Sequence, residues 1–154
     1  MMKHIEMLVS VVLIFTGAVL VLPVSLGADT AAGGEDMARG LVGTWLLAPN
    51  ARASEGSIVF SDSGTYVLKE KHRDGTGVET KGEYILNAGV TPARIDLCLE
   101  KCGNPGSEWT TRFGIVRILA SGAVEIFTSK DSHYPSAFPE DTTGEYSMLL
   151  TKAE

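Results

Sequence analysis

From residue 41 onward, apolar residues recur at every second position in short runs that turn-forming residues separate. A period of two puts successive side chains on opposite faces of an extended strand, so these runs are typical of half-buried antiparallel strands. No amphipathic helical pattern of useful length competes with them in this region. The runs predict eight strands, over residues 41–47, 57–61, 65–69, 78–86, 93–99, 109–119, 123–128 and 145–152.

The connections between these runs are short and contain glycine, which adopts positive φ without steric cost. They are residues 61–64, 74–77, 87–89, 104–106 and 120–122. Hairpins of this kind join consecutive strands into one up-and-down sheet, and closing the sheet removes its exposed edges. We therefore expect an all-β, eight-stranded antiparallel barrel, whose interior side chains or one small ligand can fill.

Alternation also assigns each residue to a face. The expected interior set is Leu41, Gly43, Trp45, Leu47, Ile58, Phe60, Tyr66, Leu68, Ile95, Leu97, Leu99, Val124, Ile126, Tyr146, Met148 and Leu150. The expected outer set is Lys69, Arg94, Asp96, Cys98, Glu125 and Glu145. In the run 109–119, Trp109 and Phe113 fall out of phase with Val116 and Ile118. A β-bulge at Gly114 would bring them into phase.

The start of the chain has the layout of an export signal. Lys3 gives a short basic start, an apolar run covers residues 8–26, and small residues lead to Ala28. We expect residues 1–28 to be a signal peptide and the protein to be exported, periplasmic or secreted. A retained membrane anchor stays open as an alternative, because a spanning helix needs about 20 residues. Pro23 favours cleavage, since proline is a poor choice in a helix meant to persist.

Charge limits the classes of partner. The chain carries a formal net charge of −6, and Lys3 and Glu6 cancel, so the part after residue 28 is equally acidic. This balance argues against nucleic acid and, once the signal is cleaved, against a membrane as partners. The only basic concentration, residues 69–73, is interrupted by Glu70 and is interpreted as the solvated end of a strand.

The remaining chain divides simply. Residues 29–40 are rich in glycine, alanine and acidic residues, which predicts a flexible arm with at most one helical turn at 35–39. Residues 41–152 form a single domain of ordinary size.

Cys98 and Cys102 are the only two cysteines. In an oxidising compartment, two thiols four residues apart in a turn-rich segment favour a disulfide. Free thiols are the second alternative. A zinc site is the third, although the spacing is not that of a zinc motif and only His72 and His133 follow the signal segment. We expect no metal and no cofactor.

Several short motifs follow one another along the predicted barrel. They are Gly43-Thr44-Trp45, Gly82-Glu83-Tyr84, Pro92-Ala93-Arg94-Ile95-Asp96-Leu97, Gly114-Ile115-Val116-Arg117-Ile118 and Tyr134-Pro135-Ser136-Ala137-Phe138. The first resembles the Gly-x-Trp that opens the first strand of lipocalins and related calycins. The whole order, over residues 41–152, resembles an uncharacterised lipocalin-like domain common in planctomycete bacteria. That family usually has arginine before the proline of the last motif, where this chain has Tyr134.

The resemblance implies a barrel and an export-linked setting, since the family has no established activity. It also implies structural roles for Gly43 and Trp45. In lipocalins the tryptophan plugs one end of the barrel, and a basic side chain from the last strands lies over its ring. Arg117 and Lys152 are the two candidates for that cation–π contact.

No catalytic constellation emerges from the sequence. Asp62-Ser63-Gly64 is similar to the nucleophile context of some serine proteases, but it occupies a predicted hairpin tip. The carboxylates are scattered, and solvated strand faces account for them. His133 precedes the last strand in a long loop and is interpreted as a surface histidine, with a ligand or gating role as the alternative. We therefore expect a protein that is not an enzyme.

Three hypotheses about function remain: two kinds of binding protein and, ranked last, an enzyme. The first is an exported binding protein for a small apolar or amphipathic molecule at the barrel mouth. Its candidate ligand contacts are Tyr66, Tyr84, Phe113, Phe127 and Tyr134. The second is an exported protein-interaction module, such as a protease inhibitor, in which residues 29–40 insert into a partner.

Overall fold

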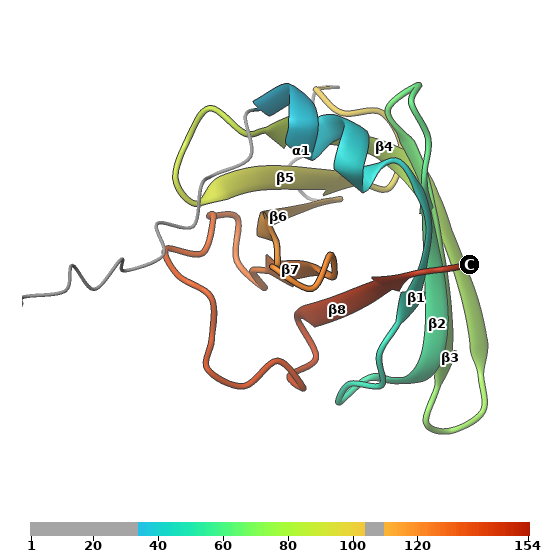
Figure 1. Cartoon of the computed structure of the whole chain (residues 1–154). Coiled ribbons are helices and arrows are strands. Elements are labelled where there is room, and N and C mark those ends of the chain that lie inside the picture. The colour runs from blue at the N-terminus through green and yellow to red at the C-terminus, as the bar shows by residue number, and fades with distance from the viewer. Residues whose placement is uncertain (1–33, 104–109) are drawn as a thin grey trace, which may run out of the picture. The chain divides into compact units, whose positions relative to one another are not determined.

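The computed structural model describes residues 34–103 and 110–154, which fold into one short helix and eight strands (Figure 1). They are α1 (Gly34–Leu41), β1 (Gly43–Leu47), β2 (Ala53–Phe60), β3 (Thr65–His72), β4 (Gly77–Asn87), β5 (Ala93–Cys98), β6 (Thr111–Ile118), β7 (Val124–Thr128) and β8 (Ser147–Lys152). Each strand pairs antiparallel with its sequence neighbour, and β8 pairs with β1. The predicted closed up-and-down barrel is confirmed. The expected signal peptide, residues 29–33, the turn 104–106 and Trp109 lie outside the described residues.

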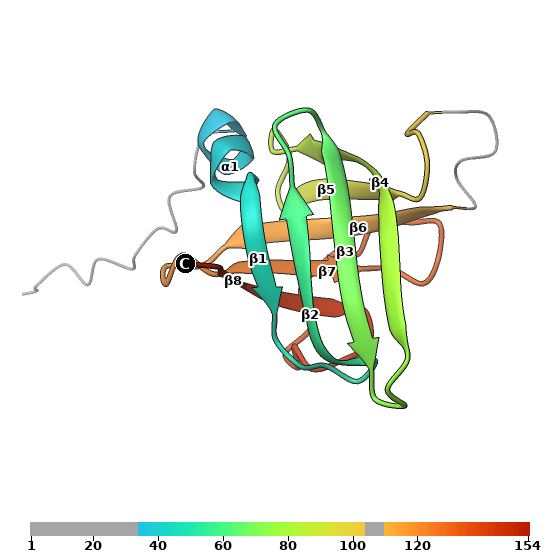
Figure 2. The same ribbon diagram turned by 90° about the vertical axis from the view of Figure 1, so that its right-hand side faces the viewer.

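The two halves of the barrel cross each other. In Figure 2, β1 to β4 stand upright at the front and β5 to β8 run across behind them. The change of partner falls within β4, which pairs with β3 up to Glu83 and with β5 from Glu83 to Asn87. A Cβ atom added at Gly82 would lie 1.7 Å from the carbonyl oxygen of Cys98. Glycine is needed here because two backbones approach closely at this point.

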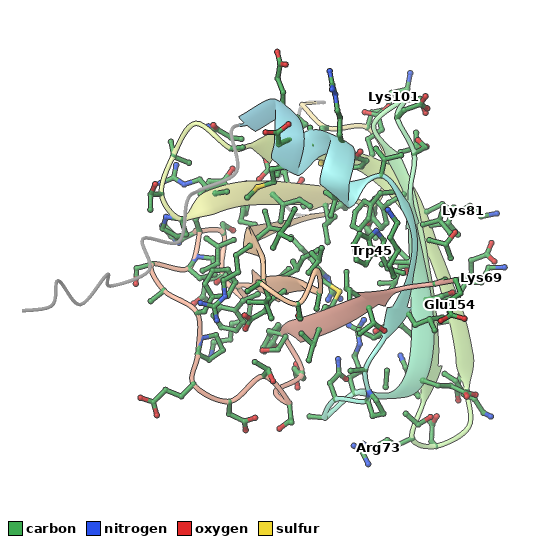
Figure 3. All side chains as sticks on the ribbon, in the orientation of Figure 1. Trp45, Lys69, Arg73, Lys81, Lys101 and Glu154 are labelled. Carbon is green, nitrogen blue, oxygen red and sulfur yellow. A yellow bond between two sulfur atoms is a disulfide. The ribbon has the colours of Figure 1, made fainter. Side chains whose placement is uncertain are left out.

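Most of the predicted interior is buried. Trp45, Ile58, Leu97 and Ile126 are all at most 2% exposed, and Figure 3 shows Trp45 inside the barrel below α1. Three predictions are wrong. Leu99 is 47% exposed because β5 ends before it, at an open end of the barrel. The other two, Cys98 and Glu125, were expected to be exposed on the outer face and are 2% and 1% exposed.

The outer face of β6 and β7 is covered, contrary to the expectation from alternation. Glu125 is 1% exposed and Ile115 is fully buried, although both point away from the interior. The pairing of β6 runs without a register shift, so the predicted bulge at Gly114 is wrong. Phe113 therefore lies on the outer face. Its phase looked anomalous because alternation between apolar and polar residues fails where both faces of a strand are buried.

The helical turn expected at residues 35–39 is present, but as part of a longer helix that packs on the barrel, so the expected flexibility is wrong for residues 34–40. Residues 34–41 form α1, which buries Met37 and Leu41 against the barrel. Acidic residues in its first turn and Arg39 in its last suit the helix dipole. The Trp45 indole Nε1 donates a 2.7 Å hydrogen bond to the Leu41 carbonyl. The helix thus covers the barrel end at which Trp45 lies.

Part of the opposite end is closed by polar groups from the β1–β2 connection. Arg52 pairs with the carboxylate of Glu70, which points inward and is 5% exposed. The Asn50 side chain accepts hydrogen bonds from two backbone amides, and it donates one of 2.9 Å to the Ser147 carbonyl. The interpretation of residues 69–73 as a solvated strand end is therefore wrong at Glu70. Strands β2 and β3 also extend further toward this end than predicted, to Ala53 and His72.

Candidate functional site

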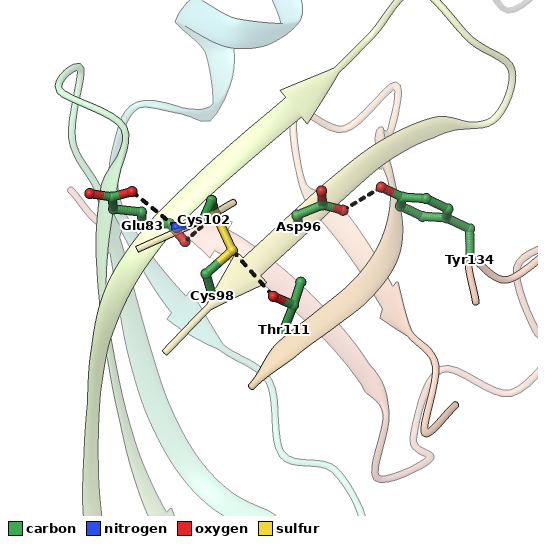
Figure 4. The surroundings of a disulfide bond; sticks show 6 residues. All are labelled: Glu83, Asp96, Cys98, Cys102, Thr111 and Tyr134. Carbon is green, nitrogen blue, oxygen red and sulfur yellow. Dashed lines mark hydrogen bonds between the residues drawn. A yellow bond between two sulfur atoms is a disulfide. The ribbon is translucent and has the colours of Figure 1, made fainter. Parts of the chain in front are cut away.

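The long connection between β7 and β8, residues 129–146, crosses the outer face of the β5–β7 sheet (Figure 1). Tyr134 anchors it: its hydroxyl donates a 2.6 Å hydrogen bond to Asp96 (Figure 4). The Arg94 guanidinium lies 4.4 Å from the centre of the Tyr134 ring, and the Phe113 ring packs edge-on at 5.2 Å. Burial, followed by the hydrogen bond to Asp96, raises the pKa of Tyr134 to about 12. The Tyr134 hydroxyl therefore stays protonated at neutral pH and serves to hold the connection on β5 through its hydrogen bond to Asp96.

A second anchor holds the same connection further along the barrel. Arg117 donates a 2.7 Å hydrogen bond from Nε to the buried Glu125 carboxylate, and its guanidinium lies 4.2 Å from the centre of the Phe138 ring. These contacts explain why Glu125 is buried on an outer face. The two anchors fix residues 134–138, and both this stretch and the residues before it line hollows on the surface.

A large hollow opens at the end of the barrel away from α1. It has a volume of about 790 Å³ and lies between Leu99 and residues 110–112 on one side and residues 129–133 and Tyr146 on the other. We call it the mouth hollow. Its lining is Leu99, Thr110, Thr111, Arg112, Ser129, Lys130, Asp131, Ser132, His133 and Tyr146. The barrel is packed near Trp45 and more open at this end.

Strand register explains how Arg112 reaches the mouth hollow. Arg112 pairs with the inward-facing Leu97, so its side chain starts on the interior face of β6. Burial raises the pKa of Tyr66 in the core, and the positive charge of Arg112 opposes that rise. For Tyr146, a hydrogen bond with Glu145 is the largest cause of its raised pKa, and Arg112 again acts in the opposite direction. The Arg112 charge therefore lowers the pKa of a tyrosine in the core and of a tyrosine at the rim of the mouth hollow.

A second, more apolar hollow adjoins the mouth hollow. It has a volume of about 460 Å³ and shares Ser129, Lys130, Asp131 and Tyr146 with it. We call it the side hollow. Its remaining lining residues are Phe127, Thr128, Pro135, Ser136 and Ala137. The two hollows together form a recess with charged groups on one side and apolar groups on the other.

The five candidate ligand contacts do not come together. Tyr66 is 3% exposed in the core, and Tyr84 packs edge-on against Phe60 at 5.0 Å. The Tyr84 hydroxyl donates to the Ser61 carbonyl at 2.8 Å. Phe113 and Tyr134 pack together on the outer face. Of the five, Phe127 lines one of the two adjoining hollows.

Sequence reasoning missed Arg112 and Lys130 because it searched for aromatic side chains. The signal that could have found Arg112 was its position. Arginine at an inward-facing position of a barrel strand must be paired inside or lie at an opening, because burying an unpaired charge is costly. His133, interpreted as a surface histidine, lines the mouth hollow.

The predicted disulfide is present, with Cys98 and Cys102 joined after the end of β5 (Figure 4). The backbone amide of Cys102 donates a 3.1 Å hydrogen bond to the Glu83 carboxylate. The alternatives of free thiols and zinc are thereby excluded. A disulfide is typical of oxidising compartments and points to a non-cytoplasmic setting.

Of the two basic residues expected to lie over the Trp45 ring, Lys152 does so and Arg117 does not. The Lys152 Nζ lies 5.6 Å from the centre of the Trp45 ring, while Arg117 contacts Phe138 instead. Gly43 has a φ of +135°, which L side chains rarely adopt. Trp45 and Lys152 therefore form the cation–π pair.

The described residues assemble no catalytic or metal centre that we can identify. Ser63 bonds Ser61 at 2.7 Å within the β2–β3 turn, whereas His72 ends β3 and His133 lines the mouth hollow. Within residues 34–103 and 110–154, no group of three or more histidine, cysteine or carboxylate side chains is placed to hold a metal ion.

The fold and the recess define a lipocalin-like, eight-stranded antiparallel barrel with an opening at one end. No family model, curated protein or solved structure matches the chain. None of the described helices is long and apolar enough to cross a membrane.

Proposed function

We propose that this chain is an exported, lipocalin-like binding protein that holds a small amphipathic molecule in the recess at the open end of the barrel. The observation that carries the proposal is the union of the mouth hollow and the side hollow around Tyr146. Ligand sites in proteins enclose about 300–1,000 Å³ and combine apolar walls with a few polar groups. The mouth hollow falls within that range, and the side hollow adds the apolar surface of Phe127.

The packing of the interior favours this location over the centre of the barrel. Phe60 and Tyr66 lie 6.5 Å apart between ring centres, and Tyr84 packs against Phe60. These rings fill the middle of the core, together with Ile58 and Ile126. A ligand at the mouth therefore needs no rearrangement of the core.

The export part of the proposal is supported by the disulfide and by the signal-like segment 1–28. The proposed membership of a lipocalin-like family is supported by the barrel topology and by the contact of Trp45 with Lys152. The alternative function, a protein-interaction module, used residues 29–40 as an inserting arm. Of that arm, residues 34–40 belong to α1, and α1 packs on the barrel. This packing favours the small-molecule binder.

Two measurements test the proposed function. Native mass spectrometry of the oxidised protein from its own cells should show a small molecule bound with a reproducible mass. Titration with decyl maltoside or decanoate, followed by amide NMR shifts, should then perturb Arg112, Tyr146 and Phe127 before any residue of α1. A protein partner in place of a small adduct would favour the interaction module.

A matched pair of variants locates the site. Phe127→Ala removes an aromatic wall of the side hollow and should weaken amphiphile binding roughly five- to thirtyfold, about 1–2 kcal/mol. Leu46→Ala removes an apolar side chain that is 51% exposed on the outer face of β1, outside both hollows, and should leave binding unchanged. Equal effects of the two variants would contradict this location.

A further inference from the structure

We infer that the recess selects an amphiphile with an oxyanion head group, such as a carboxylate or sulfate, which Arg112 and Lys130 hold in the mouth hollow. This inference rests on the proposed function and adds the chemical class of the ligand. The first observation is that both cations line the same hollow and that neither has a carboxylate partner among the described residues. His133 adds a hydrogen-bond donor beside them, whereas the Tyr146 hydroxyl already bonds the Glu145 carboxylate.

The other arginines on the barrel strands and their connections contrast with Arg112. Arg52 and Arg117 each pair with a buried carboxylate, of Glu70 and Glu125 respectively. Arg73 donates to a backbone carbonyl, and Arg94 lies over the Tyr134 ring. Among these five arginines, Arg112 is the one with no such partner in the described ranges.

The overall charge of the chain makes this local excess informative. The net charge is −6, yet the described lining of the mouth hollow has two cations, Arg112 and Lys130, against the carboxylate of Asp131, while Glu145 bonds Tyr146 at the rim. A cleft lined by charges of one sign focuses the local potential, so basic side chains in the recess attract an anion even on a chain that is acidic overall. Arginine also matches the geometry of carboxylates and sulfates through two parallel N–H donors.

The position of the side hollow assigns the other end of the ligand. Phe127, Pro135 and Ala137 give it apolar walls, and it meets the mouth hollow at Ser129–Asp131 and Tyr146. A head group bound at Arg112 can therefore direct a short apolar chain past Tyr146 toward Phe127. This arrangement suits a single dissolved molecule of an anionic amphiphile, whose tail lies along the side hollow, and not a lipid whose tail stays in a bilayer.

Four amphiphiles with the same decyl tail test the inference on the oxidised protein. Each is used below its critical micelle concentration. They are decanoate, decyl sulfate, decyl maltoside and decyltrimethylammonium. Isothermal titration calorimetry should show both anions binding at least tenfold more tightly than the neutral and cationic compounds. Acetate, which has the head group alone, should bind at least a hundredfold more weakly than decanoate.

Variants separate the head-group contact from the fold. Arg112→Gln and Lys130→Gln should each reduce the preference for anions at least fivefold, while decyl maltoside binding changes by less than twofold. Arg39→Gln on α1 is the matched control, because Arg39 is an exposed cation remote from the recess, and it should change neither. If Arg112→Gln fails to fold, Lys130→Gln provides the same comparison.

The possible failures are distinguishable. Equal binding of all four compounds, or a preference for anions that survives both variants, would overturn the anion assignment and leave the proposed function standing. Binding of none of the four would overturn both. Binding to phosphatidylglycerol vesicles without binding of monomeric decanoate would replace the soluble ligand by a membrane surface and would also overturn the inference.

Discussion

The Tyr134 hydroxyl and the Asp96 carboxylate are joined by a 2.6 Å hydrogen bond that ties the β7–β8 connection to the outer face of β5. This bond places Tyr134 where Arg94 and Phe113 can pack on its ring. The tie also sets the position of Pro135, which lines the side hollow. An outer-face contact thus supports the recess.

Removing this tie should cost measurable stability. Tyr134→Phe keeps the ring contacts and loses the hydrogen bond, so the free energy of unfolding should fall by about 1 kcal/mol. Urea denaturation monitored by circular dichroism measures the difference. Tyr146→Phe is the control, since the Tyr146 side chain is not one of the ties to β5. An effect of Tyr134→Phe below that of the control would contradict the role assigned to Asp96.

The same tie predicts how stability depends on alkaline pH. The folded-state pKa of Tyr134, about 12, exceeds the value of 10.0 for an unperturbed tyrosine. A raised pKa means that the contribution of the protonated hydroxyl is fully present below pH 10 and is lost as the pH rises toward 12. The difference in unfolding free energy between the native protein and Tyr134→Phe should therefore shrink over that interval. A difference that stays constant over the interval would argue against this linkage.

Reduction of the disulfide should leave the barrel folded. Cys98 and Cys102 close a very short loop, so the bond contributes only about 2 kcal/mol in the chain-entropy account. Eight paired strands hold the fold independently of it. Intact-mass measurement with and without reductant, together with circular dichroism, tests this. Complete unfolding on reduction would show that the bond contributes far more.

The buried ion pair at the open end should be worth more than a surface pair. Glu70→Gln leaves Arg52 without its charged partner and should lower the unfolding free energy by about 2 kcal/mol, less than for a fully buried pair because Arg52 is partly exposed. Glu79→Gln removes the exposed contacts with Lys69 and Lys81 and should cost less than about 0.5 kcal/mol. Thermal unfolding ranks the two variants, and similar losses would contradict the distinction.

Gly82 and Gly77 in β4 form a matched pair for backbone crowding. Gly82→Ala would place a methyl group against the Cys98 carbonyl, so it should cost more than about 3 kcal/mol or prevent folding. A Cβ atom at Gly77 meets nothing within 4 Å, and Gly77→Ala should be close to neutral. Soluble yield and thermal unfolding compare the two. Equal tolerance would show that β4 and β5 can separate.

The sequence predicted the barrel well because most strands bury one face only. In β1 and β5, alternation placed Trp45, Ile95 and Leu97 correctly in the core. It failed where the chain folds back on itself: residues 129–146 cover the outside of β6 and β7, so Ile115 and Glu125 are buried there. No local pattern reports that a distant connection will cover a strand.

The candidate site was predicted less well than the fold, for a related reason. The aromatic candidates were chosen by residue type, but four of the five pack against structural partners, such as Asp96 for Tyr134 and Phe60 for Tyr84. The recess itself depends on where residues 129–133 lie relative to Leu99 and residues 110–112. A charged residue on the inward face, Arg112, was the local signal that pointed to it.

The pairing of β1 with β8 determines when the barrel can close during folding. Trp45 pairs with Lys152, and the amide of Ala153 donates to the Thr44 carbonyl at 2.9 Å. Until β8 pairs with β1, β1 and β7 each present an unpaired edge, and the sheet cannot close. Completion of the fold therefore waits for β8. Before Lys152 is in place, the open edges expose the chain to aggregation.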